Sequence, residues 1–350
     1  AVLRRRDVLK AAAGTPFLTA LAFAEGPERD ERRPRDLVLI ISDDQSRFDL
    51  GCYGNAACTT PNVDRLASEG ARFSAAYTPV SLCMPARSCL YTGLYPHKHG
   101  ATGFDPVRAG VKTWPMWLSG ALATGMVGKL NVLPPEQFPF EILSRGGALN
   151  KEGRSPAKYE QLFAEFLAEV GERRFAVVVN IKDPHRPFDE DRFVGEVSGA
   201  GGARHAPSDV WVPPCLWDTP ETRRELADYY GALQRLDETA GRVLRLLEEA
   251  GRVEEALVIF TSDNGMPFPF AKSTLYEAGI NLPFIARWPG VVEPGGASDA
   301  FVNLVDLLPT ALDVAGLPGG ELDGRSLLPL LRGEASALHE HVVGALDELL

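Results

Sequence analysis

The sequence is poor in the residues that cross-link small proteins. Its five cysteines are few for 350 residues, are unevenly spaced and include no C-x-x-C pair. These features argue against a disulfide scaffold and a zinc ribbon, and a chain of this length buries a core that needs neither. Cys52 and Cys58 could pair in an oxidising compartment, and the sequence leaves this open.

The sequence also lacks an excess of basic residues and, beyond its N-terminal segment, any long apolar run. Its formal net charge is −11, which disfavours nucleic acid as a partner. An anionic substrate would have to be attracted by a local cluster of bases. No stretch is long and apolar enough to predict a permanent membrane anchor.

The N-terminal segment, residues 1–24, is typical of an export signal. Arg4-Arg5-Arg6 precedes an apolar run that ends in Ala22-Phe23-Ala24. This pattern resembles a twin-arginine signal with cleavage near Ala24 and predicts a periplasmic or extracellular protein. A permanent membrane anchor, for which the apolar run is short, and a basic amphipathic helix packed on the domain are the alternatives. Residues 25–36 then form a charged linker. Without residues 1–24, which carry four basic residues and one acidic residue, the formal charge becomes −14.

Apolar runs alternate with helical patterns along the rest of the chain. This alternation predicts a doubly wound α/β fold with a mainly parallel central sheet and helices on both faces. The predicted buried strands are Asp36–Ile41, Phe175–Ile181, Leu257–Phe260 and Phe284–Trp288. The predicted helices are Thr60–Gly70, Ala86–Thr92, Met116–Ala123, Lys158–Val170, Thr219–Gly251 and Asn303–Ala315. Residues 190–217 are rich in Gly, Pro and Ser and predict a long loop.

Two of the predicted strands end in acidic or amide residues. Asp43 and Asp44 follow the first strand, and Asp263 and Asn264 follow the third. Because open α/β sheets bind ligands at the carboxyl edge of their strands, we expect the two pairs to meet there. Their oxygen atoms suit Ca²⁺ or Mg²⁺ better than zinc. Either aspartate alone could instead cap a helix.

The stretch Ser81–Gly93 contains the pentapeptide C-x-P-x-R, from Cys83 to Arg87. The predicted helix after Pro85 would direct its N-terminus toward Cys83, where free N–H groups favour an anion. A small buried thiol is the alternative interpretation of this cysteine.

These motifs, taken together and in order, resemble the sulfatase family of the alkaline-phosphatase-like superfamily. The resemblance covers residues 36–332, and so predicts a catalytic domain over 37–332, and it is nearest to the heparan N-sulfatase (sulfamidase) branch. It rests on the pentapeptide, Asp43-Asp44, Gly128-Lys129, Asp183-Pro184-His185-Arg186, residues 261–269, residues 271–279 and residues 324–329.

The resemblance implies a mechanism and a set of site residues. A formylglycine-generating enzyme would oxidise Cys83 to formylglycine; one hydroxyl of its hydrate attacks sulfur, and the other expels sulfate as the aldehyde re-forms. The implied metal ligands, for Ca²⁺ with Mg²⁺ as an alternative, are Asp43, Asp44, Asp263, Asn264 and the modified Cys83. The implied groups that stabilise the sulfuryl oxygens are Arg87, Lys129 and Lys272, with His185 as a donor. The implied substrate is a sulfated sugar, which suggests glycosaminoglycan degradation.

Three features depart from the family pattern. Ala86 replaces the usual serine of the pentapeptide, and Asn131 replaces a histidine that would assist release of sulfate. The chain stops at Leu350, so residues 333–350 are expected to begin an incomplete C-terminal segment. Two alternatives to a sulfatase follow. One is a phosphodiesterase or phosphonate hydrolase with the same nucleophile, and the other is a catalytically impaired protein that binds sulfated glycans.

Overall fold

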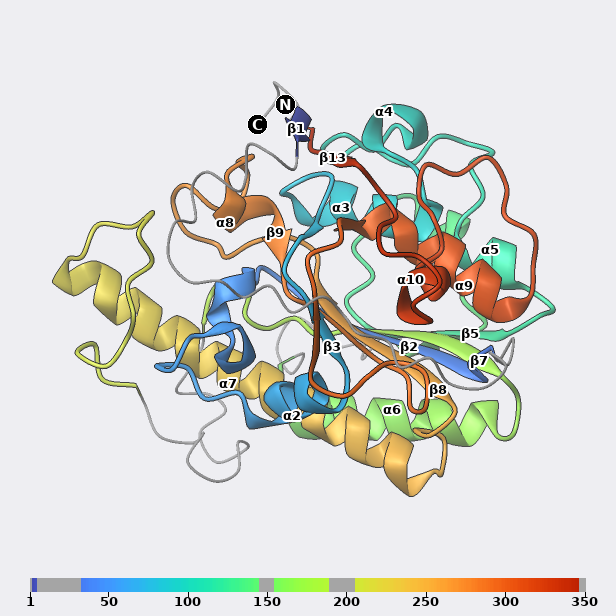
Figure 1. The fold of residues 1–350 in the computed structure, drawn as a ribbon, viewed down its shortest axis with the longest axis horizontal. Helices are drawn as coiled ribbons and strands as arrows, with labels where there is room; N and C mark the ends of the chain where they lie inside the picture. The colour runs from blue at the N-terminus through green and yellow to red at the C-terminus, as the bar shows by residue number, and fades with distance from the viewer. Residues whose placement is uncertain (1, 5–32, 145–153, 189–204, 346–350) are drawn as a thin grey trace.

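The computed structural model describes residues 2–4, 33–144, 154–188 and 205–345. Its centre is an eight-stranded sheet covered by helices on both faces (Figure 1). The strands lie in the order β11 (Gly296–Ser298), β3 (Ala71–Phe73), β10 (Phe284–Arg287), β8 (Ala256–Ser262), β2 (Asp36–Ser42), β7 (Phe175–Asn180), β5 (Ala123–Gly128) and β6 (Ile142–Ser144). Within this sheet β10 runs antiparallel to both neighbours and the other pairs are parallel. The predicted doubly wound, mainly parallel fold is confirmed.

Strand β2 shows why its sequence is an unbroken apolar run. Leu37, Leu39 and Ile41 pack into one core, and Val38 and Ile40 pack into the other, because successive side chains of a strand point to opposite faces. The first core contains residues of α3 (Cys83–Thr92), α5 (Trp114–Leu118), α9 (Leu307–Ala315) and α10 (Leu328–Leu331). The second contains residues of α2 (Pro61–Glu69), α6 (Pro156–Val170) and α7 (Pro220–Glu249), which lie below the sheet in Figure 1.

Most helix predictions are confirmed, and one is wrong in its bounds. The pattern over Met116–Ala123 predicted a helix, but α5 spans Trp114–Leu118. Gly120 has a φ of 81°, a left-handed conformation that ends a helix, and Ala123 already begins β5. Two further short helices are α4 (Pro96–His99) and α8 (Glu277–Ile280).

Two small sheets complete the described fold. One contains β12 (Val302–Asn303), β4 (Ala76–Tyr77) and β9 (Asn281–Leu282), and the other pairs β1 (Val2–Arg4) with β13 (His341–Val343). Strand β1 lies within the predicted export signal. The rest of that signal and most of the predicted linker lie outside the described residues, so both stay predictions. No helix in the described ranges has the length and hydropathy needed to cross a bilayer.

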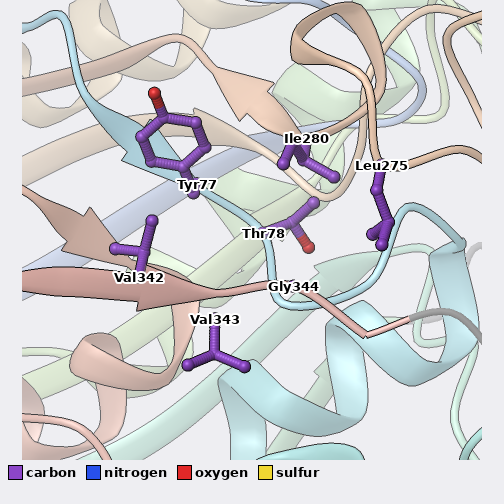
Figure 2. Close-up of a pocket in the computed structure, with 7 residues that line it drawn as sticks. All are labelled: Tyr77, Thr78, Leu275, Ile280, Val342, Val343 and Gly344. Atoms are coloured by element: carbon purple, nitrogen blue, oxygen red, sulfur yellow. The ribbon is translucent and has the colours of Figure 1, made fainter. Parts of the chain in front are cut away.

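A small, mostly apolar cavity lies beside β13 (Figure 2). It is lined by Tyr77, Thr78, Leu275, Ile280, Val342, Val343 and Gly344. None of these residues belongs to the predicted site, so the cavity is a gap in a satellite cluster of the core. All five cysteines are free thiols, and Cys52 and Cys58 are therefore not joined in this structure.

Helix α2 is held at its N-terminus by a carboxylate from another helix. Asp237 of α7 accepts hydrogen bonds from the backbone N–H groups of Asn62 (3.2 Å) and Val63 (2.8 Å) and from the Asn62 side chain (2.8 Å). Thr60, the residue that precedes the helix, makes no side-chain capping bond of its own. The contact therefore caps α2 and also ties it to α7.

We predict that Asp237→Ala lowers the free energy of unfolding by about 1–2 kcal/mol, because it removes a helix cap and leaves buried N–H groups without an acceptor. The measurement is chemical denaturation. Asp228→Ala is the matched control, because Asp228 is an exposed aspartate on the same helix. Equal losses in the two variants would show that the cap contributes nothing.

Candidate active site

The ends of two central strands bring the predicted acidic residues together. Strands β2 and β8 pair in parallel with Ser42 opposite Ser262, so the residues that follow them leave the sheet side by side. The side chain of Asn264 donates a hydrogen bond to Asp44 Oδ1 at 2.8 Å, and the backbone N–H of Asp44 donates to Asp263 Oδ1 at 3.1 Å. The predicted convergence of these two pairs is confirmed.

Asp44 occupies an unusual backbone conformation. Its φ is 72°, in the left-handed region that few residues other than glycine, asparagine and aspartate adopt. The phenol of Tyr229, from α7, lies 3.1 Å from the Asp44 carbonyl oxygen and 2.6 Å from a carboxylate oxygen of Asp49. Contacts from β8 and α7 therefore hold Asp44 from two sides.

Cys83 faces these carboxylates from the first position of α3. Its Sγ lies 3.4 Å from Asp43 Oδ1 and 3.5 Å from Asp44 Oδ1, and Lys272 Nζ lies 3.1 Å from the sulfur. Burial and the neighbouring carboxylates, that of Asp263 foremost, raise the pKa of the Cys83 thiol well above its usual range. These surroundings disfavour the thiolate form of the unmodified side chain.

Arg87, one turn further along α3, is fully buried and links two strand ends. Its Nε donates to Asp263 Oδ2 at 2.9 Å, and its Nη1 donates to the side-chain oxygen of Asn180 at 2.6 Å. Asn180 is the last residue of β7 and in turn donates to the Tyr91 hydroxyl at 2.9 Å. The guanidinium thus compensates one of the buried carboxylates.

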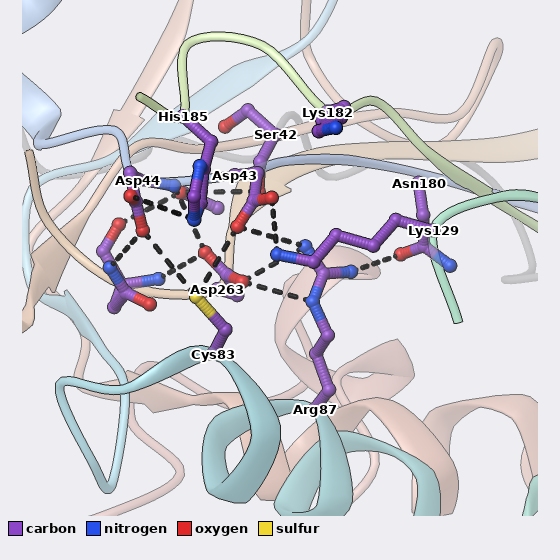
Figure 3. Close-up of polar contacts among 12 residues, drawn as sticks. Ser42, Asp43, Asp44, Cys83, Arg87, Lys129, Asn180, Lys182, His185 and Asp263 are labelled. Atoms are coloured by element: carbon purple, nitrogen blue, oxygen red, sulfur yellow. Dashed lines mark hydrogen bonds and ion pairs between the residues drawn. The ribbon is translucent and has the colours of Figure 1, made fainter. Parts of the chain in front are cut away.

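The remaining predicted residues lie next to the same carboxylates, and Figure 3 labels Lys129 and His185 among them. Lys129, which follows β5, places Nζ 2.5 Å from Asp43 Oδ2, and Lys272 places Nζ 2.5 Å from Asp44 Oδ1. His185 Nε2 lies 3.8 Å from Asp44 Oδ2 on a side chain that is 33% exposed. The structure therefore brings all nine predicted site residues into one cluster.

The carboxylates differ in their electrostatic surroundings. Burial raises the pKa of Asp43, but the charges of Lys129 and Arg87 outweigh it and hold the pKa well below its usual range. Burial raises the pKa of Asp263 to about 6; Arg87 opposes this shift, and the charge of Asp43 adds to it. Two adjacent buried carboxylates cannot both be charged at low cost unless cations stay beside them.

The donor set fits a hard divalent cation. Ligand atoms of Asp43, Asp44, Cys83 and Asp263 lie within 4.8 Å of one another, and all four residues are buried. Asp44 Oδ2 and Asn264 Oδ1 are buried and accept no hydrogen bond from the part of the chain that the structure describes. Buried acceptors without donors are costly, and a cation bound by carboxylate and amide oxygens would satisfy both atoms.

Sequence reasoning missed three residues around this site. Asn180 could have been found because a polar residue ends a buried strand beside the two acidic strand ends. Lys182, two residues beyond that strand, is labelled near Asp43 and Lys129 in Figure 3, and burial together with the neighbouring charges of Arg154 and Lys129 lowers its pKa. Tyr229 carried no signal, because in the sequence it is one of many apolar positions on a helix.

His97 and His99, two histidines separated by one residue, do not join the cluster. His99 is fully buried, and its Nε2 contacts Cys89 Sγ at 3.2 Å, while its Nδ1 accepts from the backbone of Ala101 at 3.0 Å. His97 is exposed beside it.

Asn131 has a φ of 45°, a conformation that asparagine tolerates better than most residues.

We predict that Arg87→Met lowers the free energy of unfolding by about 3–5 kcal/mol, because it removes one partner of a buried ion pair and leaves Asp263 uncompensated. Arg245→Met is the control. Arg245 pairs with Glu160 on the surface, and its loss should cost less than about 1 kcal/mol. Chemical denaturation of both variants measures the difference, and similar losses would mean that the buried pair gives no special stability.

Comparisons with known proteins agree with this geometry. The sequence model of a family described as Sulfatase matches residues 35–317. Human N-sulphoglucosamine sulphohydrolase is 36% identical over 340 residues, which cover 86% of this chain and 67% of that protein. The chain spans 60% of the length of another curated relative, the ulvan-active sulfatase of Formosa agariphila, which is 29% identical over 88% of this chain.

Solved structures share the fold at low sequence identity. The phosphonate monoester hydrolase of Agrobacterium radiobacter superposes with a TM-score of 0.70 at 22% identity and covers 86% of this chain and 77% of its own. A protein in complex with its substrate D-glucosamine-2-N,6-O-disulfate superposes with a TM-score of 0.69 at 21% identity and covers 87% and 81%.

Proposed function

We propose that this chain, which belongs to the sulfatase family, is a sulfuric ester hydrolase that removes sulfate from an N-sulfated or O-sulfated sugar at the site around Cys83. The observation that carries the proposal is the position of this cysteine. It begins a helix, faces three buried carboxylates and an amide, and is surrounded by Arg87, Lys129 and Lys272. Sulfate is an anion, and this is where the chain gathers fixed cations.

We propose that Cys83 acts after conversion to formylglycine, with a formylglycine-generating enzyme as partner. The position of Cys83 at the start of α3, beside Lys272 and the carboxylates, supports this. The hydrated aldehyde would supply the nucleophile and the means of releasing sulfate. The C-x-P-x-R sequence that begins with Cys83 is complete, although Ala86 lies within it.

Asp43, Asp44, Asp263 and Asn264 would hold the divalent cation, which we propose is Ca²⁺, with Mg²⁺ as the alternative. The bound cation would polarise a sulfuryl oxygen and favour the ionised nucleophile. The buried oxygens Asp44 Oδ2 and Asn264 Oδ1, which lack donors among the described residues, support this assignment. Three carboxylates and no nitrogen ligand favour an alkaline-earth ion over zinc.

The basic residues have separable roles. Lys129 and Lys272 are only 20% and 18% exposed, so their charges act in a partly dry site, where they stabilise developing negative charge more than in water. Arg87 is fully buried and orients Asp263 rather than meeting substrate. His185 is the most exposed of these groups and can donate a proton to the leaving oxygen or nitrogen. It can also serve in place of the family histidine that Asn131 replaces.

The named relatives guide the substrate proposal. An enzyme of N-sulphoglucosamine and a structure with a glucosamine disulfate lie among the similar proteins, so we favour a glucosamine-type sugar and a role in glycosaminoglycan degradation. The fold is shared with a phosphonate monoester hydrolase, which keeps hydrolysis of a phosphonate or phosphodiester as the second candidate. Export to the periplasm or outside the cell remains a prediction from residues 1–24.

A substrate panel tests the function. After co-expression with a formylglycine-generating enzyme, we expect the Cys83 peptide to show formylglycine by mass spectrometry. We expect the protein to hydrolyse N-sulfoglucosamine or an O-sulfated glucosamine with a higher kcat/KM than a phosphonate monoester or a phosphodiester. Cys83→Ala should lower kcat at least about 10³-fold, and Cys215→Ala, which changes a cysteine outside the cluster, should not.

Two outcomes of the panel would contradict the proposal. A preference for the phosphorus substrates would favour the second candidate. An unmodified Cys83 together with binding of sulfated sugars but no turnover would identify a glycan-binding protein that has lost its activity.

We predict that Ca²⁺ stabilises the protein after treatment with a chelator. At a concentration about 100 times its Kd, one bound ion adds about 2.7 kcal/mol to the free energy of unfolding, and thermal unfolding measures this as a rise in Tm. Asp44→Asn should abolish most of the rise, because it removes a charged ligand at constant shape, whereas Asp228→Ala should not. A larger rise in Tm with Mg²⁺ than with Ca²⁺ would identify Mg²⁺ as the preferred ion. No rise in Tm with either ion would refute the metal site.

A further inference from the structure

Two aromatic side chains stand out on the surface near the site. Phe270 is 52% exposed and Tyr276 is 64% exposed, and their rings contact each other edge-on with centroids 6.3 Å apart and an interplanar angle of 61°. Phe268, only two residues earlier, is buried against Phe188 and Tyr229. The segment therefore buries one phenylalanine and presents the next to solvent.

The pair flanks the residue that reaches the nucleophile. Both rings belong to the segment between β8 and α8 that carries Lys272, whose Nζ lies 3.1 Å from Cys83 Sγ. The segment is fixed beneath them, since the Ser273 N–H donates to the Ser81 carbonyl at 2.8 Å and the Thr274 hydroxyl donates to the Ala271 carbonyl at 2.6 Å. The two rings thus contact each other on the loop whose charged side chain, that of Lys272, enters the site.

The backbone of this loop is strained at the exposed ring. Phe270 has a φ of 61° and Ser273 a φ of 64°, values in the left-handed region where a bulky side chain is rarely found. Such conformations cost free energy and cluster at ligand-binding sites. Burial of the Phe270 ring does not offset the cost here, because more than half of that side chain is exposed.

The exposed aromatic pair and the charged groups of the site together match the chemistry of a sulfated sugar. Its partly exposed charged groups, Lys129, Lys272 and His185, suit a sulfate. Aromatic faces and edges suit the apolar C–H surface of a pyranose ring, which a charged group cannot hold. A large aromatic pair beside an anion site therefore suits a ligand that carries both an anionic group and a ring.

We propose that Phe270 and Tyr276 form a sugar-binding platform, on which the pyranose ring that bears the sulfate packs while the sulfate reaches Lys272 and Cys83. This inference rests on the proposed function and adds to it the residues that select a sugar over other sulfate esters. Both are specificity-determining residues that contact the ring and take no part in bond cleavage.

The test measures binding, so that it does not depend on turnover. In a Cys83→Ala background, calorimetry gives the Kd of N-sulfoglucosamine and of inorganic sulfate for the parent, for Phe270→Ser and for Tyr276→Ser. We expect each substitution to weaken sugar binding about five- to tenfold, as for the loss of one aromatic contact. We expect the affinity for inorganic sulfate to stay within about twofold, because the cations that hold sulfate are unchanged.

Phe104→Ser is the matched control. Phe104 is 70% exposed on the segment after α4, and its replacement should leave both affinities unchanged. Sugar affinities in the two platform variants equal to that of this control would overturn the proposal, and so would a parent that binds sulfate but not the sugar. A change of oligomeric state by light scattering, with sugar affinity unchanged, would instead identify the pair as an interface between copies of the chain.

The same variants separate this inference from the proposed function. Hydrolysis of the sulfated sugar by the wild type, together with unchanged sugar affinity in Phe270→Ser and Tyr276→Ser, would reject the platform and keep the function. Weaker sugar binding by Phe270→Ser and Tyr276→Ser than by their parent, together with a wild type that hydrolyses no sulfate ester, would keep the platform and reject the function.

Discussion

The parallel register of β2 and β8 is the constraint on which the site depends. Ser42 lies opposite Ser262, and Asn264 therefore contacts Asp44 although 220 positions separate them in the sequence. A slip of one residue would turn every side chain of a strand to the other face of the sheet. Two apolar cores, one on each face, prevent that slip. The packing of the two cores thus fixes the strand register, and the register fixes the geometry of the site.

Three carboxylates in one buried cluster repel one another, and neighbouring basic side chains compensate their charge. Like charges without water repel strongly. Lys129 and Lys272 each pair with one of the carboxylates, and Arg87 pairs with two of them, Asp263 and Asp43. The side chains of Lys129 and Lys272 also occupy the space among the carboxylates in this structure. Lys129 and Lys272, which compensate two of the carboxylates, are therefore also the cations available to an anionic substrate, and they act locally in a chain with a formal charge of −11.

Much of the fold and of the site could be predicted, because their signals are local. Continuous apolar runs identified four strands, β2, β7, β8 and β10, but not the glycine-containing buried strand β5. Polar residues at the strand ends identified Asp43, Asp44, Asp263 and Asn264. The resemblance supplied Cys83, and the structure places it as expected. Residue roles that depend on tertiary contacts could not be predicted from the sequence. Tyr229 looks like any apolar position of its helix, yet its phenol lies beside the Asp44 carbonyl and Asp49. The helix expected over Met116–Ala123 ends early at a glycine turn, since periodicity does not determine where a helix stops.

The central proposal is that the carboxylate cluster holds a cation next to a modified Cys83. A crystal structure of the protein after co-expression with a formylglycine-generating enzyme and growth with Ca²⁺, with anomalous scattering data, tests it directly. We predict an ion bound by Asp43, Asp44, Asp263 and Asn264, with residue 83 present as formylglycine or its hydrate and directed at the ion. A cluster without an ion, in which an unmodified Cys83 stays between the Lys129–Asp43 and Lys272–Asp44 pairs, would contradict the claim.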